Sequence, residues 1–135
     1  MKKLLLVILL SSSCATFRHS SIPVAERITT ILEEISIAAD TATNTGLFTR
    51  EQRQQFAKEV MLPAITATQG LAGCLLSNKC SQLPLYLTTI SQCLLKAVNQ
   101  FASALPDSTV KRAIIEKSNV ALVYVNNLYV KVGGK

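Results

Sequence analysis

The sequence has few of the residues that catalytic and metal sites require. Its 135 residues include one histidine, His19, and no tryptophan. A dinuclear metal site in a helical bundle needs glutamates and a Glu-x-x-His motif, which does not occur here. Glycine-rich phosphate loops, Gly-x-Ser-x-Gly elbows and Cys-x-x-Cys pairs do not occur either, and a nucleophilic cysteine would need a neighbouring base. We therefore expect no enzyme activity, no metal and no cofactor.

Dense basic runs are also lacking. The formal net charge is +6, from 14 basic and 8 acidic residues that are scattered along the chain. Nucleic-acid sites usually gather lysine and arginine on one face, often among aromatic residues. This sequence has four phenylalanines and three tyrosines. We therefore expect no nucleic-acid partner, and a solvated basic surface with a mild attraction to anionic lipid.

The apolar run at the N-terminus is too short to cross a membrane. Basic residues at positions 2 and 3 precede the apolar segment Leu4–Leu10, and three serines end it. A membrane-spanning helix needs about 20 apolar residues. A basic start, a short apolar run and small residues at its end are typical of a secretory signal peptide. We predict that residues 1–13 form such a signal and that the protein is exported.

A cysteine, Cys14, directly follows the predicted signal. The stretch Leu10-Ser11-Ser12-Ser13-Cys14 resembles the lipobox of bacterial lipoproteins, in which a small residue precedes an obligatory cysteine. The resemblance covers residues 1–14 and departs from the family at Ser11, where leucine is usual. It implies that Cys14 is diacylglycerylated, that the signal is cut before it, and that its new amino group is acylated with a chain such as palmitate. Several acyl chains anchor a protein stably, whereas one chain binds marginally. Simple secretion is the alternative.

The resemblance also implies a location in the bacterial cell envelope. Aspartate after the lipidated cysteine tends to retain Gram-negative lipoproteins in the inner membrane, and Ala15 stands there instead. In a Gram-negative host we therefore expect the outer membrane, facing the periplasm. Residues 14–23 lack helical periodicity and are predicted to be the lipidated cysteine and a flexible tether. Small lipoproteins are encoded by bacteria, phages and prophages; this sequence lacks the proline-rich composition of phage lysis lipoproteins, and its origin is left open.

Residues 24–132 are predicted to form four helices, followed by a frayed tail at 133–135. The first helix begins near Pro23 and ends at Asn44-Thr45-Gly46. The second begins at a capping box, Thr49 with Gln52, and is kinked by Pro63. Apolar residues recur at three- and four-residue spacing in all four helices. These stripes comprise Val24, Ile28, Ile31, Leu32, Ile35, Ala38, Ala39 and Ala42; Phe56, Val60, Ala64, Ala67, Leu71 and Leu75; Leu83, Leu87, Ile90, Leu94, Val98, Phe101 and Leu105; and Val110, Ile114, Ala121, Val125, Leu128 and Val132.

Two features of these helices stay open. Residues 121–132 suit a helix but also resemble two β-rich runs around an Asn-Asn turn. A single hairpin is marginally stable, so we favour the helix. The small residues Ala64, Ala67, Gly70 and Gly73 either let a neighbouring helix approach closely or mark a fraying helix end. The predicted fold class is all-α, a small antiparallel four-helix bundle with short connections.

The cysteines after Cys14 predict one disulfide. An exported protein meets an oxidising compartment, where free thiols tend to pair. Cys74 and Cys80 flank the loop between the second and third helices. Cys93 would lie roughly 15–20 Å further along the third helix, at about 1.5 Å per residue. Since a disulfide joins Cα atoms less than about 7 Å apart, we predict the pair Cys74–Cys80 and a buried, unpaired Cys93.

Two functions from different classes remain. The first is a membrane-anchored interaction or structural module, which contacts the bilayer through acylated Cys14 and binds an unidentified envelope protein. The second is a periplasmic or surface carrier that holds an apolar ligand between its helices. An enclosed apolar cavity would favour the carrier, and a fully packed interior would favour the module.

Overall fold

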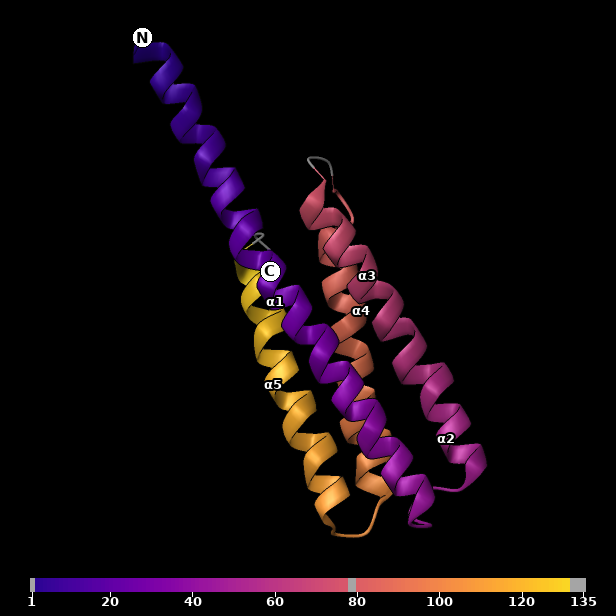
Figure 1. The fold of residues 1–135 in the computed structure, drawn as a ribbon. Helices are drawn as coiled ribbons and strands as arrows, with labels where there is room; N and C mark the ends of the chain where they lie inside the picture. The colour runs from indigo at the N-terminus through magenta and orange to yellow at the C-terminus, as the bar shows by residue number, and fades with distance from the viewer. Residues whose placement is uncertain (1, 78–79, 132–135) are drawn as a thin grey trace.

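The protein is an antiparallel bundle of four helices (Figure 1). The computed structural model describes the backbone of residues 2–77 and 80–131, and the side chains of residues 21–77 and 80–131. Within these residues it contains no strand, so the predicted all-α bundle is confirmed. The elements are α1 (Lys2–Asn44), α2 (Arg50–Phe56), η1 (Ala57–Met61), α3 (Leu62–Leu76), α4 (Leu83–Lys96), η2 (Ala97–Phe101), η3 (Ala102–Ala104) and α5 (Thr109–Lys131).

Each helix packs against two neighbours around the bundle. Helix α1 lies between α3 and α5, and α4 lies between the same two helices on the other side. We call the end of the bundle that holds Ser21, Leu76, Leu83 and Lys131 the proximal end, because the N-terminal part of α1 projects from it (Figure 1). The opposite end, with the turns 45–49 and 105–108, is the distal end.

The core follows a seven-residue repeat. In α1 the most deeply buried side chains are separated by four and three residues in alternation, and α5 shows the same spacing. This spacing keeps one stripe facing the partners when helices cross at a shallow angle, as in most four-helix bundles. The two series are Ser21, Ala25, Ile28, Leu32, Ile35, Ala39 and Ala42 in α1, and Ile114, Ser118, Ala121, Val125 and Leu128 in α5.

The predicted apolar stripes form this core. Every residue of the predicted second stripe is buried, and so are most residues of the others; Val24, Leu83, Val98 and Val110 are half-buried. At the distal end the rings of Phe48, Phe56 and Phe101 pack together, with centroids 5.1–6.4 Å apart. Phe56 and Phe101 meet edge to face, the arrangement that aromatic quadrupoles favour.

Pro63 disturbs its helix one turn before its own position. Its ring would collide with the carbonyl group of Glu59 in a regular α-helix. The backbone is instead π-helical over Ala57–Met61, and α3 starts at Leu62 with the proline in its first turn. A π-helical turn holds an extra residue, which widens the turn where the ring would clash. The predicted disturbance is therefore present as a π-helical segment.

The predicted start of the first helix is wrong. Helix α1 does not begin near Pro23 but runs without a break from Lys2 to Asn44, with Pro23 inside it. Residues 14–23, predicted as a flexible tether, therefore have helical backbone. Proline inside a helix removes one hydrogen bond and costs about 3 kcal/mol. The helix nevertheless continues through Pro23, and Ser21 and Ala25 on either side of it are buried against the bundle.

The ambiguous last segment is helical. Residues 121–131 continue α5, and Ala121, Val125 and Leu128 point into the core. A hairpin would turn at the Asn126-Asn127 pair, but both asparagines lie on the exposed face of the helix. Val132 and the predicted frayed tail, residues 133–135, lie outside the described residues.

The helix ends follow the predicted signals. Gly46 has a φ of 80°, which only glycine adopts without strain, and it ends α1 as predicted. The side chain of Thr49 accepts a hydrogen bond from the amide of Gln52 at 3.0 Å. The amide of Thr49 in turn donates to the side chain of Gln52 at 2.8 Å, which completes the predicted capping box.

Candidate functional site

The predicted lipidation site lies in the projecting part of α1. The backbone of Cys14 is helical there, seven residues before Ser21 enters the bundle. The side chains of residues 1–20 lie outside the described residues, so the signal peptide and the lipidated thiol stay predictions. The fold shows where this segment leaves the bundle: it projects from the proximal end (Figure 1).

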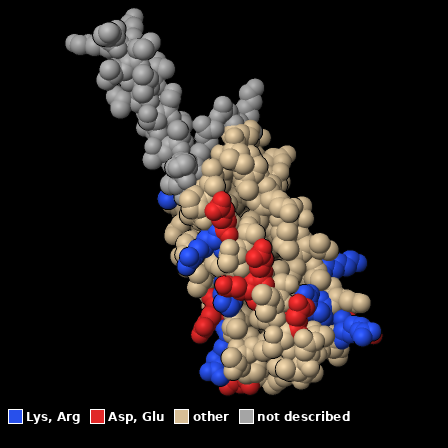
Figure 2. Space-filling model, in the orientation of Figure 1, with Lys and Arg blue, Asp and Glu red and all other residues tan. Residues whose placement is uncertain are grey.

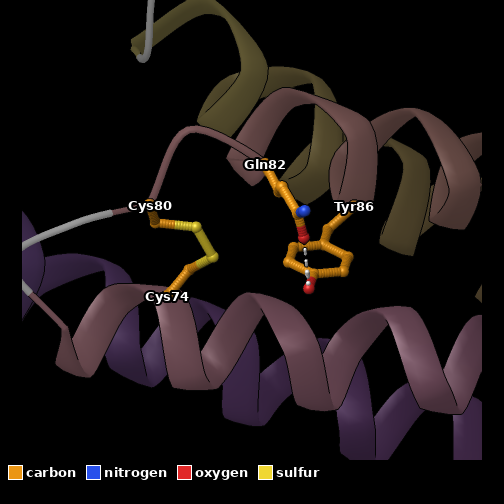
Figure 3. Close-up of a disulfide and its surroundings, with 4 residues drawn as sticks. All are labelled: Cys74, Cys80, Gln82 and Tyr86. Atoms are coloured by element: carbon orange, nitrogen blue, oxygen red, sulfur yellow. Dashed lines mark hydrogen bonds between the residues drawn. A yellow bond between two sulfur atoms is a disulfide. The ribbon is translucent and has the colours of Figure 1, made fainter.

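The predicted disulfide closes the proximal loop. Cys74 in the last turn of α3 is bonded to Cys80, which precedes α4, and their Cα atoms lie 5.1 Å apart (Figure 3). This pairing was predicted from the position of the loop and is confirmed. The bond ties the end of α3 to the start of α4 across a connection of a few residues, so it fixes the spacing of these helices at the proximal end.

A groove of about 500 Å³ lies beside the disulfide. Its walls include Gly70, Gln82 and Tyr86, and the hydroxyl of Tyr86 donates to the side-chain oxygen of Gln82 at 3.0 Å (Figure 3). A Cβ atom at Gly70 would lie 2.6 Å from the ring of Tyr86, whereas one at Gly73 would meet nothing within 4 Å. The sequence left two interpretations of these small residues, a close helix approach or a fraying helix end. Gly70 allows a close approach by α4, whereas Gly73 lies on the exposed surface of its helix.

The thiol of Cys93 is buried and unpaired, as predicted. It lies in α4 on the core side, away from the disulfide loop. Burial raises the pKa of this thiol above its ordinary value, and the nearby ammonium of Lys96 lowers it by less. A cysteine nucleophile needs a lowered pKa and an accessible sulfur. Cys93 therefore behaves as a small apolar core residue.

Two further grooves separate α5 from its neighbours. The one against α1, about 380 Å³, is lined by charged residues that include Arg27, Glu34, Glu116 and Lys117. In it the ammonium of Lys117 lies 2.7 Å from a carboxylate oxygen of Glu34. The groove against α4, about 140 Å³, has Thr88, Ser91, Gln92 and Asn126 in its walls together with Leu87, Val125 and Tyr129. All three grooves are open to solvent and have polar side chains in their walls, although the wall of the groove between α4 and α5 is mostly apolar. No pattern in the sequence predicts them.

Metal-binding residues do not come together in the described part of the chain. No group of three or more histidine, cysteine, aspartate or glutamate side chains lies close enough there to hold an ion. One helix of the described chain, Arg50–Leu76, is long enough and contains an 18-residue window apolar enough to cross a membrane, with a mean hydropathy of 1.3 in that window. The core helix of a bundle can have the same composition, and this helix buries Phe56, Val60 and Leu71 against its neighbours.

The chain was compared with protein-family models, curated proteins and solved structures, and no match was found. Any assignment of function therefore depends on the residues and geometry described above.

Proposed function

We propose that the protein is a lipid-anchored bacterial envelope protein that acts as a non-enzymatic interaction or structural module. The observation that carries this proposal is the sequence Leu10–Cys14, which ends a short apolar signal on a cysteine preceded by small residues. After cleavage before Cys14 the mature chain would begin at the acylated residue. Two or more acyl chains on that residue would hold the protein at the bilayer.

The arrangement of the bundle supports an anchor at this position. The segment that carries Cys14 leaves at the proximal end (Figure 1), so lipidation would not interfere with the packed core. The distal end would then face away from the membrane. There the surface is rich in charge, with the ion pair of Arg53 and Asp40 at 2.8 Å and that of Lys96 and Glu59 at 3.5 Å. Such a surface is suited to an envelope protein partner.

The carrier alternative has less support. A ligand pocket usually buries most of an apolar ligand in a concave, largely apolar site. The three grooves described above are open to solvent and contain charged or polar side chains. Large, fully buried side chains such as Phe56, Leu32 and Ile114 fill the interior of the bundle.

The intact mass of the membrane-extracted protein tests the anchor. We expect a mature chain that begins at Cys14 and carries the added mass of a diacylglyceryl group and an N-linked acyl chain. Cys14→Ser should remain uncut and unlipidated, while the matched control Cys93→Ala should be processed normally because Cys93 lies in the core. A mature chain that begins at another residue, or one without lipid, would refute the proposal.

A further inference from the structure

The proximal end of the bundle has exposed aliphatic side chains on three of its helices. Leu76 in the last turn of α3 is 72% exposed, Leu85 in the first turn of α4 is 61% exposed, and Val130 near the end of α5 is 72% exposed. Because α3 and α5 end here and α4 begins here (Figure 1), all three residues belong to the same end of the bundle. Exposed aliphatic residues also lie elsewhere on this bundle, as at Ile37, Leu62 and Val123, so these three side chains indicate a contact only together with the lack of charge at this end.

Acidic residues are scarce at the same end. Leu62–Leu76 and Leu83–Leu95 contain no charged residue, and α5 beyond Lys117 contains only Lys131, which is exposed. Glu26 is the acidic residue of α1 nearest this end, and Arg27 follows it. In Figure 2 charged side chains cover the middle and lower parts of the bundle, and the described surface next to the proximal loop is mostly uncharged. An apolar end with few charges can approach a lipid surface, and the single exposed lysine, Lys131, adds a weak attraction to anionic headgroups.

The length of chain between Cys14 and the bundle brings this end close to the bilayer. Cys14 lies seven residues before Ser21, which corresponds to about 10 Å of helix. A diacylglyceryl group places its cysteine at the boundary between acyl chains and headgroups, and each headgroup layer is about 5–8 Å thick. The proximal end would therefore meet the outer edge of the headgroups.

From these observations we propose that the proximal end rests on the bilayer, with Leu76, Leu85 and Val130 at the outer edge of the lipid headgroups and Lys131 beside anionic lipid. This inference depends on the proposed lipid anchor and adds an orientation to it. The bundle stands with its helices away from the membrane plane, and its charged distal end is the part that a protein partner can reach.

Tryptophan substitution tests the contact, because the chain has no tryptophan of its own. The full-length lipidated variants Leu85→Trp and Val130→Trp are placed in vesicles of phosphatidylethanolamine and phosphatidylglycerol, with and without lipids brominated near the headgroup. We expect a blue-shifted emission that the brominated lipids quench at both positions. Leu62→Trp is the matched control, since Leu62 and Leu85 are both 61% exposed on neighbouring helices but Leu62 lies further towards the distal end. Ile37→Trp, on α1, is a second control, and we expect neither control to be quenched.

The outcomes separate this inference from the proposed anchor. If the protein does not float with the vesicles, the anchor itself fails. If it floats but positions 85 and 130 are quenched no more than position 62, the end-on contact is refuted. Equal, strong quenching at positions 62 and 85 would show that the bundle lies on its side, which also refutes the proposal. Blue-shifted emission without quenching by brominated lipid would indicate a protein contact instead of a lipid contact.

Discussion

Loss of the Cys74–Cys80 disulfide is expected to destabilise the bundle by about 2 kcal/mol. The bond joins residues six apart in the sequence, so it closes a short loop. The chain-entropy model gives about 2 kcal/mol for a loop of this length, mainly because the unfolded chain is constrained. For a domain of this size that difference corresponds to a fall in Tm of about 10 °C.

Thermal unfolding followed by circular dichroism, with and without reductant, measures this effect. The double variant Cys74→Ala, Cys80→Ala should unfold at the temperature of the reduced wild-type protein, and reductant should not change it further. Cys93→Ala is the matched control: it should keep the sensitivity to reductant, since Cys93 is unpaired.

Thiol counting on the same samples identifies the bond. Apart from Cys14, the denatured protein should expose one reactive thiol before reduction, that of Cys93, and three after reduction. Three reactive thiols before reduction would show that Cys74 and Cys80 are not bonded. An unchanged Tm on reduction of a bonded protein would refute the entropic argument, because it would mean that the bond gives no net stabilisation by constraining the unfolded chain.

Three further predictions concern the packing of the bundle. Phe56→Ala should lower the free energy of unfolding by about 3–5 kcal/mol in urea denaturation, since the ring is fully buried among aromatic neighbours; a loss well below that of Phe56→Leu would contradict this packing. Gly73→Ala should stabilise the protein by up to about 1 kcal/mol through helix propensity, whereas Gly70→Ala should destabilise it because the new methyl group meets the ring of Tyr86; equal effects would contradict the close approach. Burial raises the pKa of the Cys93 thiol, so the folded thiol should stay protonated and react with an alkylating reagent far more slowly than it does in urea. The stability that this thiol contributes should fall as the pH rises above the pKa of an unfolded thiol. The same pH dependence of stability in the wild-type protein and in Cys93→Ala would contradict this.

Much of the bundle could be predicted because helix periodicity depends on nearby residues alone. Spacing of three and four placed Phe56, Leu71 and Leu94 in the core, and each is buried. The disulfide followed from the same periodicity, since helix lengths placed Cys74 and Cys80 at one turn and Cys93 far along the next helix. These inferences needed only local geometry.

Features that depend on contacts between helices could not be predicted in this way. The sequence gives no reason to distinguish Gly70 from Gly73, because the difference is the ring of Tyr86 on another helix. The exposure of Leu76, Leu85 and Val130 was also missed, since an apolar residue outside a stripe can lie on any surface. The π-helical segment before Pro63 leaves a faint signal: Phe56, Val60 and Ala64 are four apart in succession, as expected when a turn holds an extra residue.

Pro23 is the reason that the predicted start of the first helix is wrong, and it lies where α1 leaves the bundle towards Cys14. A proline inside a helix removes the hydrogen bond to the carbonyl group of His19, so α1 has its weakest backbone point where it enters the bundle. Buried residues on both sides, Ser21 and Ala25, hold the helical path there in place of that bond. A helix kinks most readily at such a point. A change of direction at Pro23 would move Ser21 from its buried position, so the packing of Ser21 and Ala25 opposes such a kink. Under the proposed anchor at Cys14, the direction that α1 takes through Pro23 therefore sets how the proximal end meets the membrane.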